Sequence, residues 1–223
     1  MTFSIAGRCA RTGMFGVVVT TSSLAVGSRC AFAKAGVGAA LTQHRTDPRL
    51  GPLAIELMER GFTARQAMDA VVAATPHRDW RQLAFIDRDG GTASFSGARV
   101  KPELNEVHGR DCVALGNIVR SAEVPAAMVR TFEADAGAAL ATRLIAALEA
   151  GDQAGGELIP LVSAALLIVD RQPFPYVDLR VDSDPAPIAA LAKLWRDYAP
   201  LADSFVARAI DPDSVVLPAV PQT

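Results

Sequence analysis

Residues 2–20 read TFSIAGRCARTGMFGVVVT, and this stretch decides the kind of fold that we expect. Residues 2–6 alternate and residues 14–20 form a β-branched run, so both segments are predicted to be strands. Arg11, Thr12 and Gly13 between them are typical of a turn. The two strands therefore predict a hairpin that begins at residue 2 and places the amino terminus in a sheet.

The rest of the chain continues in blocks of strands and blocks of helices. Glycines thin a third expected strand at residues 35–43, and two helices follow between residues 53 and 76. The remaining strands are expected at residues 82–87, 92–96, 112–115, 163–170 and 176–181, and the remaining helices at residues 122–133, 138–148 and 188–198. Such blocks predict an α+β fold with two antiparallel sheets packed face to face and helices outside them. We expect one domain over residues 2–210 and an extended tail at residues 211–223.

Composition excludes several classes of function. The 223 residues carry a formal net charge of −2, so bulk electrostatics does not draw the chain to nucleic acid or to an anionic membrane. The longest dense apolar run, residues 158–169, is shorter than the roughly 20 residues of a spanning helix, and we expect no secretory leader. Three widely spaced cysteines without a Cys-x-x-Cys pair indicate a reduced, cytoplasmic location. His44, His77 and His108 have no metal-motif spacing, so we expect no metal and no cofactor.

Thr2 is the first candidate for chemistry. A small second residue normally lets methionine aminopeptidase remove Met1, which would leave threonine at the terminus. The α-amine titrates at roughly 7.7–8.0, so near pH 7 it can accept the proton of its own hydroxyl and later return it to a leaving amine. Many chains begin with Met-Thr by chance, so the dipeptide alone leaves an ordinary terminus open. A strand that starts at residue 2 favours the nucleophile, because a terminus pinned in a sheet can hold one.

Several motifs resemble a known family. They are MTFSI at 1–5, LAVGSRCAFAKAGVGAALTQ at 24–43, DPRLGPLAIELMERG at 47–61, RQLAFIDRDGGTASFSGARV at 81–100, GN at 116–117, SAALLIVD at 163–170 and VDLRVDSDP at 177–185. In this order they resemble DUF1028, a family in the N-terminal nucleophile (Ntn) hydrolase superfamily. The resemblance implies a four-layer αββα sandwich and an N-terminal nucleophile that attacks amide bonds. Carried over, that role falls on Thr2, both as hydroxyl and as amine.

Other candidate catalytic residues each keep a structural alternative. Asn117 could donate its side-chain amide to a tetrahedral oxyanion, or cap a turn. In some Ntn-hydrolases a lysine near the third strand favours the neutral amine by like-charge repulsion. That role would fall on Lys34, which is otherwise a surface lysine.

The candidate substrate-binding residues lie at strand ends and on one late strand. Thr21 and Ser22 end the second strand, where they either bind substrate or hydrogen-bond a turn. Gln43 ends the third strand and is a further candidate. Asp178 and Arg180 share one face of a strand, where they form either a structural ion pair or an anchor for a substrate carboxylate.

Some positions depart from the family pattern toward apolar residues. Residues 157–162 read ELIPLV, and Phe95 and Leu115 stand where polar residues are expected. Two interpretations follow. The first is an amidohydrolase that cleaves a carboxamide or ureido C–N bond of a small molecule through an acyl-enzyme. The alternative is a non-catalytic binding or assembly protein on the same fold. We expect a homo-oligomer in either case.

Overall fold

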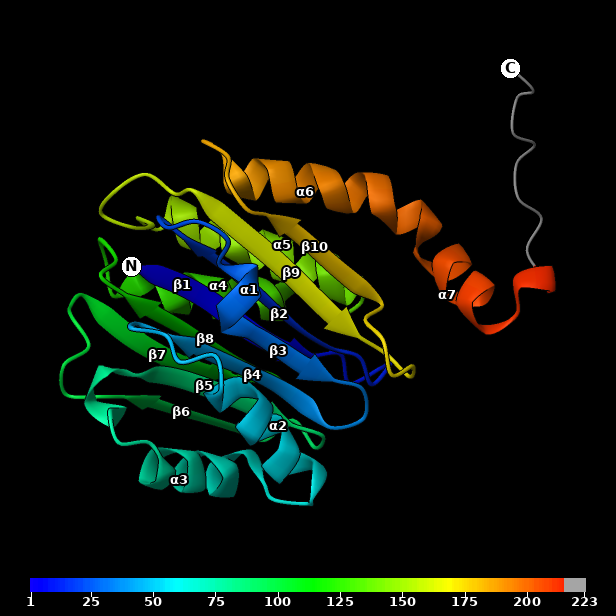
Figure 1. The fold of residues 1–223 in the computed structure, drawn as a ribbon. Coiled ribbons are helices and arrows are strands. Elements are labelled where there is room, and N and C mark those ends of the chain that lie inside the picture. The colour runs from blue at the N-terminus through cyan, green and yellow to red at the C-terminus, as the bar shows by residue number, and fades with distance from the viewer. Residues whose placement is uncertain (215–223) are drawn as a thin grey trace.

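Two antiparallel sheets form the centre of the computed structural model, which describes residues 1–214 (Figure 1). The six-stranded sheet has the order β10-β9-β2-β1-β8-β7 and the four-stranded sheet has the order β3-β4-β5-β6. The larger sheet contains β1 (Thr2–Arg8), β2 (Phe15–Thr21), β7 (Leu104–Gly109), β8 (Cys112–Asn117), β9 (Ser163–Val169) and β10 (Val177–Val181). The smaller one contains β3 (Ala31–Lys34), β4 (Gly38–Gln43), β5 (Gln82–Asp87) and β6 (Thr92–Ser96). The first strand of the chain is therefore a central strand of the larger sheet.

Helices cover the outer face of each sheet. The larger sheet packs against α4 (Glu123–Ala134), α5 (Leu140–Gln153) and α6 (Pro187–Tyr198), and the smaller sheet against α2 (Leu50–Glu59) and α3 (Ala64–Ala74). A third apolar core lies between the sheets and includes Ala6 and Val17 from one sheet and Leu41 and Ala84 from the other. These layers confirm the α+β sandwich, with the order αββα, that the sequence predicts.

The alternation of side chains along β1 explains how one strand serves two cores. Phe3 and Ile5 are fully buried against the helices of the larger sheet. Ser4 points the other way and bonds to Gln43 of the smaller sheet. Because the side-chain period of a strand is two, Thr2 lies on the same face as Ser4, toward the space between the sheets.

Several short elements differ from the sequence prediction. Residues 35–37 of the strand expected at 35–43 form a tight turn, in which Gly36 has a φ of 69°, so that β4 begins at Gly38 and the preceding strand β3 was not expected. A short helix, α1 (Gly27–Cys30), precedes β3, and the edge strand β7 was not expected. The sequence of β7, LNEVHG, is too polar for the strand pattern because only one neighbour covers it.

The carboxyl-terminal part also differs. After α6, a 3-10 turn leads into α7 (Ala202–Ile210), which extends away from the sandwich (Figure 1). The tail expected to be extended from residue 211 instead has a 3-10 turn at Pro212–Ser214, and its remainder, residues 215–223, lies outside the described residues. None of the helices within residues 1–214 has the length and apolarity to cross a bilayer.

Candidate active site

The amino-terminal end of β1 is fixed on both sides. Phe3 pairs with Thr20 of β2, and Thr2 pairs with Asn117 of β8. Thr2 is only 6% exposed, although it is the second residue of the chain. Thr2 is therefore a buried strand residue that pairs with β8, as the sequence-based argument for a nucleophile requires.

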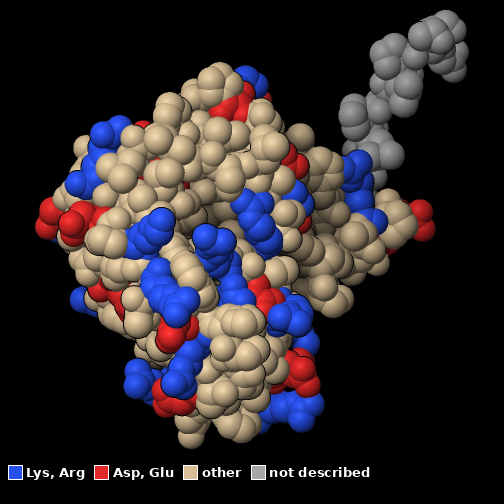
Figure 2. All heavy atoms as spheres, turned by 60° about the vertical axis from the view of Figure 1, so that its left-hand side comes forward, with Lys and Arg blue, Asp and Glu red and all other residues tan. Residues whose placement is uncertain are grey.

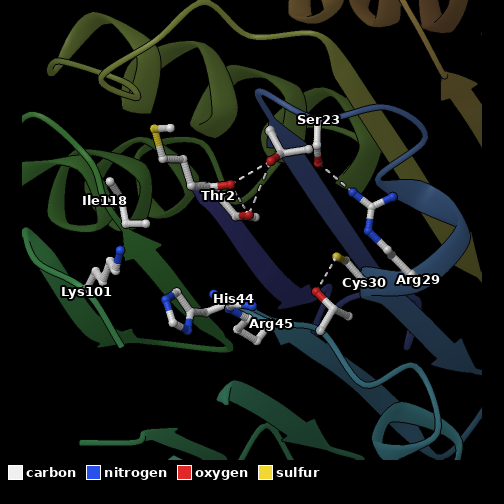
Figure 3. Close-up of a pocket in the computed structure, with 11 residues that line it drawn as sticks. Thr2, Ser23, Arg29, Cys30, His44, Arg45, Lys101 and Ile118 are labelled. Atoms are coloured by element: carbon white, nitrogen blue, oxygen red, sulfur yellow. Dashed lines mark hydrogen bonds between the residues drawn. The ribbon is translucent and has the colours of Figure 1, made fainter. Parts of the chain in front are cut away.

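Two hydroxyl groups meet at this position. Thr21, the last residue of β2, has its Oγ1 3.4 Å from Oγ1 of Thr2 (Figure 3). The Thr21 hydroxyl donates to the Met1 carbonyl oxygen at 2.6 Å, and the Thr2 hydroxyl donates to the same oxygen. The two threonines thus hold a carbonyl group between them, and the substrate-binding role expected for Thr21 stays a prediction.

A cavity of about 390 Å³ opens over these hydroxyls. Its walls come from the end of β2, from α1, from the turn after β4, from the segment between β6 and β7 and from the loop after β8 (Figure 3). The lining residues are Met1, Thr2, Thr21, Ser23, Arg29, Cys30, His44, Arg45, Thr46, Lys101 and Ile118. The volume lies near the lower end of the range for small-molecule sites, roughly 300–1,000 Å³.

Left-handed backbone conformations concentrate around this cavity. His44, Arg45 and Ile118 have φ values of 51°, 41° and 53°, and all three line it. Such conformations cost about 1–3 kcal/mol each for residues other than glycine and cluster at functional sites. The turns that follow β4 and β8 are therefore held in strained shapes where they meet Thr2.

His44 presents an unprotonated nitrogen to this region. Its Nδ1 lies 2.9 Å from the Trp80 carbonyl oxygen, which can only accept, so Nδ1 carries the proton. Burial lowers the pKa of His44, and the positive charges of the amino terminus, Arg45 and Lys101 lower it further. The neutral ring leaves Nε2 as an acceptor. The spacing of the histidines predicts no role for His44, although it directly follows Gln43 at the end of a strand.

A buried amide network forms the floor between the sheets. Ser4 donates to Gln43 Oε1 at 2.7 Å, and Gln43 Nε2 donates to Gln82 Oε1 at 2.6 Å. Asn117 Nδ2 donates to the same Gln82 oxygen at 2.9 Å. Gln43, Gln82 and Asn117 are fully buried. Gln43 is therefore a cross-sheet tether that does not line the cavity, which corrects its expected substrate-binding role.

Asn117 lies beside Thr2 but is only partly suited to its expected role. One N–H of its amide already donates to Gln82. Its Oδ1 is buried and has no hydrogen-bond partner among the described residues. The side chain therefore presents an acceptor without a partner next to the terminus, and its service as an oxyanion donor stays a prediction.

Glu157 is a functional candidate that the sequence analysis noted only as a departure from the family pattern. The residue is 4% exposed, and its Oε2 accepts a hydrogen bond from the Ser22 backbone N–H at 2.9 Å. Its Oε1 has no partner within residues 1–214. Burial raises the pKa of Glu157 to about 7, against the opposing effects of the Ser22 hydrogen bond and the amino-terminal charge. Ser22 thus acts through its backbone, and its neighbour Ser23 lines the cavity.

Three expected site residues lie elsewhere. Lys34 forms an ion pair with Glu59 at 2.6 Å, and it pairs with Gly38, at the opposite end of β4 from Gln43. Arg180 binds Asp182 at 3.0 Å on the edge strand β10, where Asp178 is also exposed. Both side chains are exposed on β10, which is an edge strand with one sheet neighbour only. Lys34, Asp178 and Arg180 are therefore surface residues outside this cavity.

The described residues also define what else the site contains. Within residues 1–214, no group of three or more His, Cys, Asp or Glu side chains is placed to hold a metal ion. Cys30 lines the cavity as a free thiol, and burial raises its pKa. The groups that line the cavity are thus hydroxyls, a neutral imidazole, a buried thiol and several cations.

This geometry defines a class of protein. It is a four-layer α+β sandwich in which a threonine at the start of a central strand faces a polar cavity. The chain belongs to DUF1028, described as a family of unknown function, whose family model matches residues 2–191.

Two solved structures are similar to this chain, and the first of them shares its fold. The DUF1028 protein SPO2555 from Silicibacter pomeroyi is 31% identical, with a TM-score of 0.83 over 88% of this chain and 85% of that one. Anbu, the ancestral β-subunit from Yersinia bercovieri, matches at 12% identity and a TM-score of 0.40, over 99% of this chain and 100% of that one. The second similarity is too low to carry an argument. The comparison with curated proteins gave no match.

Proposed function

We propose that this protein is an amidohydrolase that uses Thr2 as an amino-terminal nucleophile on the C–N bond of a small carboxamide or ureido compound. One observation carries the proposal. The hydroxyl of Thr2 stands at the start of a central strand, beside the Thr21 hydroxyl and at the wall of a cavity. The proposal requires Thr2 to be the first residue of the mature chain.

The reaction follows from the two groups that a terminal threonine carries. The α-amine takes the Oγ proton as the oxygen attacks the carbonyl carbon, and a tetrahedral oxyanion forms. The C–N bond then breaks while the ammonium returns its proton to the leaving nitrogen, which leaves an ester on Oγ. Water attacks that ester with the amine as base, so that the acid is released and the hydroxyl is restored.

The contacts of Met1 support this use of the site. Thr21 donates to the Met1 carbonyl oxygen at 2.6 Å. Once Met1 has been removed, the same hydroxyl is available to a substrate carbonyl, and it can donate to the oxyanion that forms there. Thr21 thus stabilises the negative charge that develops on the substrate carbonyl oxygen.

Unpaired acceptors near the terminus also support a liberated amine. Asn117 Oδ1 and Glu157 Oε1 are buried acceptors without partners among the described residues. Buried polar atoms rarely lack a hydrogen bond, and a new α-ammonium brings three donors to this end of β1. Glu157 would then be a positioning residue for the amine.

The second candidate function is a non-catalytic binding or assembly protein. Leu158 and Ile159 favour it, because each is 48% exposed on the segment before β9. It predicts self-association or partner binding without hydrolysis. The homo-oligomeric state and the cytoplasmic location expected from the sequence remain predictions under both candidates.

The test of the first candidate is hydrolysis by matched variants. A panel of small amides and ureido acids is offered to the wild type, Thr2→Ala and Thr2→Ser, with release of ammonia or amine as the measurement. We expect turnover by the wild type and Thr2→Ser and none by Thr2→Ala. Equal turnover by Thr2→Ala would assign the nucleophile to another residue.

A further inference from the structure

The charged side chains that line the cavity are all cationic. Arg29, Arg45 and Lys101 contribute to its walls, whereas the described lining residues include neither Asp nor Glu. Figure 2 shows Lys and Arg side chains gathered around the middle of the face that forms the left-hand side of Figure 1, where the amino terminus lies, with Asp and Glu side chains toward its lower part. The whole chain has a formal net charge of −2, so this local excess of positive charge runs against the overall balance.

The three cations differ in how they are held. Arg29 donates to neutral groups only, to the carbonyls of Leu24 and Ala25 at 2.6 and 2.9 Å and to Ser23 Oγ at 2.6 Å. The Arg45 guanidinium lies 5.0 Å from the centre of the Trp80 ring. These contacts fix the two side chains in place and leave their charges without a carboxylate.

Lys101 is the cation that remains available. Within residues 1–214 its ammonium has no hydrogen-bond or ion-pair partner, and Figure 3 shows the side chain reaching into the cavity on the side of Ile118. Neither Asp47 nor Glu157 lines the cavity or forms an ion pair with its three cations. Asp47 binds Arg49 at 2.7 Å and lies 3.7 Å from Arg81, and Glu157 accepts from Ser22. Three cations around a small cavity therefore lack a counter-charge from the chain.

We infer that the substrate is a small amide that carries a carboxylate, and that Lys101 binds this carboxylate while Arg29 and Arg45 supply the surrounding positive field. The inference rests on the proposed function and names the class of molecule that it acts on. A charge-assisted hydrogen bond from an ammonium to a carboxylate is about twice as strong as a neutral one. A neutral amide of the same size would leave the three cations uncompensated. Charge at this wall thus selects the substrate, while Thr2 performs the chemistry.

The experiment compares two electrophiles that differ in charge and otherwise only by one methyl group. A β-lactone bearing a free carboxylate and its methyl ester are each incubated with the wild type, and the rate of acylation of Thr2 is followed by intact mass. We expect the carboxylate to react about tenfold faster or more, as a charge-assisted hydrogen bond implies. In Lys101→Met the two rates should converge to within about threefold, and Lys101→Arg should restore the preference.

Lys34→Met is the matched control, because Lys34 is an exposed lysine paired with Glu59 and lies outside the cavity. It should keep the wild-type preference. Thermal unfolding of each variant shows whether the fold is intact, and Lys101→Arg keeps the test decisive if Lys101→Met is unstable. Equal acylation by both lactones in the wild type overturns the inference and leaves the nucleophile standing. Absence of any adduct at Thr2 contradicts the nucleophile, and the inference fails with it.

Discussion

At the scale of single residues, the site depends on two hydroxyls whose strands meet at one end of a sheet. Thr2 and Thr21 are 19 residues apart, too far for a short sequence motif. The pairing of β1 with β2 nevertheless brings their Oγ1 atoms to 3.4 Å from each other. A hydroxyl is a weak nucleophile until a base takes its proton and a donor stabilises the resulting oxyanion. A terminal Thr2 would supply the base, and Thr21 supplies a donor.

Thr21→Val tests that donor. The substitution keeps the shape of the side chain and removes the hydroxyl beside Thr2, so we expect acylation of Thr2 by a β-lactone to slow about 10- to 100-fold. Thr21→Ser keeps the hydroxyl and should stay within a few-fold of the wild type. An unchanged rate in Thr21→Val would show that Thr21 only hydrogen-bonds the strand end.

Glu157 predicts how stability depends on pH. Its pKa rises from an ordinary 4.5 to about 7, chiefly through burial. Between these values the folded chain keeps a proton that the unfolded chain has lost. The free energy of unfolding therefore falls as the pH rises from about 4.5 to about 7 and levels off above that.

Glu157→Gln should remove this decrease, because the amide does not titrate. At pH 8 the variant should be more stable than the wild type, by at most about 3 kcal/mol, as measured by urea unfolding across the pH range. Glu149→Gln, on an exposed position of α5, is the control and should keep the wild-type slope. The same slope in both variants would contradict the assignment to Glu157.

At the scale of elements, the strands are joined below the cavity by amides rather than by apolar packing. Gln82 on β5 accepts from Gln43 on β4 and from Asn117 on β8. It also donates to the Gly116 carbonyl at 3.1 Å and to Ser96 Oγ at 3.0 Å. One side chain thus connects both sheets at the end where β1 begins, which fixes their spacing under Thr2.

Gln82→Met tests that connection. Methionine has a similar length but accepts only weakly, so the buried amides of Gln43 and Asn117 would each lose a partner. We expect a loss of about 2–4 kcal/mol in the free energy of unfolding. Gln153→Met at the exposed end of α5 should stay within about 0.5 kcal/mol of the wild type. A loss no larger than that control would mean that the network does not hold the sheets.

The same elements show what the sequence could predict. The period of two in residues 2–6 and the block order are local signals, and they predict the hairpin and the sandwich. Thr63 as a helix cap is equally local, and the structure has the full capping box with Gln66. The site could be predicted only where it lies on those elements, at Thr2 and Thr21.

The rest of the site depends on long-range packing. His44 and Arg45 lie in a turn whose left-handed backbone conformations bring them to the cavity, and Lys101 lies in a loop that neighbouring loops hold there. No spacing rule in the sequence connects these residues with Thr2. Lys34 lies outside the cavity because it ends β3 and pairs with Gly38 at the start of β4, whereas the cavity lies beyond the other end of β4, so that the lysine faces Glu59. Arg180 and Asp178 were misplaced because an edge strand cannot be distinguished from a central one by its own pattern.

At the scale of the whole molecule, the two sheets share the core and the amide network that lie between them. We therefore expect a single cooperative unfolding transition, as the single-domain prediction requires. The chain carries one tryptophan near each of the two sheets. Trp80 lies beside the start of β5, and Trp195 lies in α6 over the larger sheet.

Trp80→Phe and Trp195→Phe each leave one fluorescent reporter. In each variant the denaturant midpoint from fluorescence should coincide with the midpoint from circular dichroism. A separation between the two probes in either variant would show that the sheets unfold as separate units and would contradict a single domain.

The central claim is that Thr2 becomes the chain terminus and carries the reaction on its own hydroxyl. The most direct measurement is the mass of the amino-terminal peptide after the purified protein has reacted with a β-lactone. The account predicts a peptide that begins at Thr2 and carries one acyl group on its side-chain oxygen. A peptide that still begins with Met1, or one that begins at Thr2 and stays unmodified while the lactone is consumed elsewhere, would contradict it.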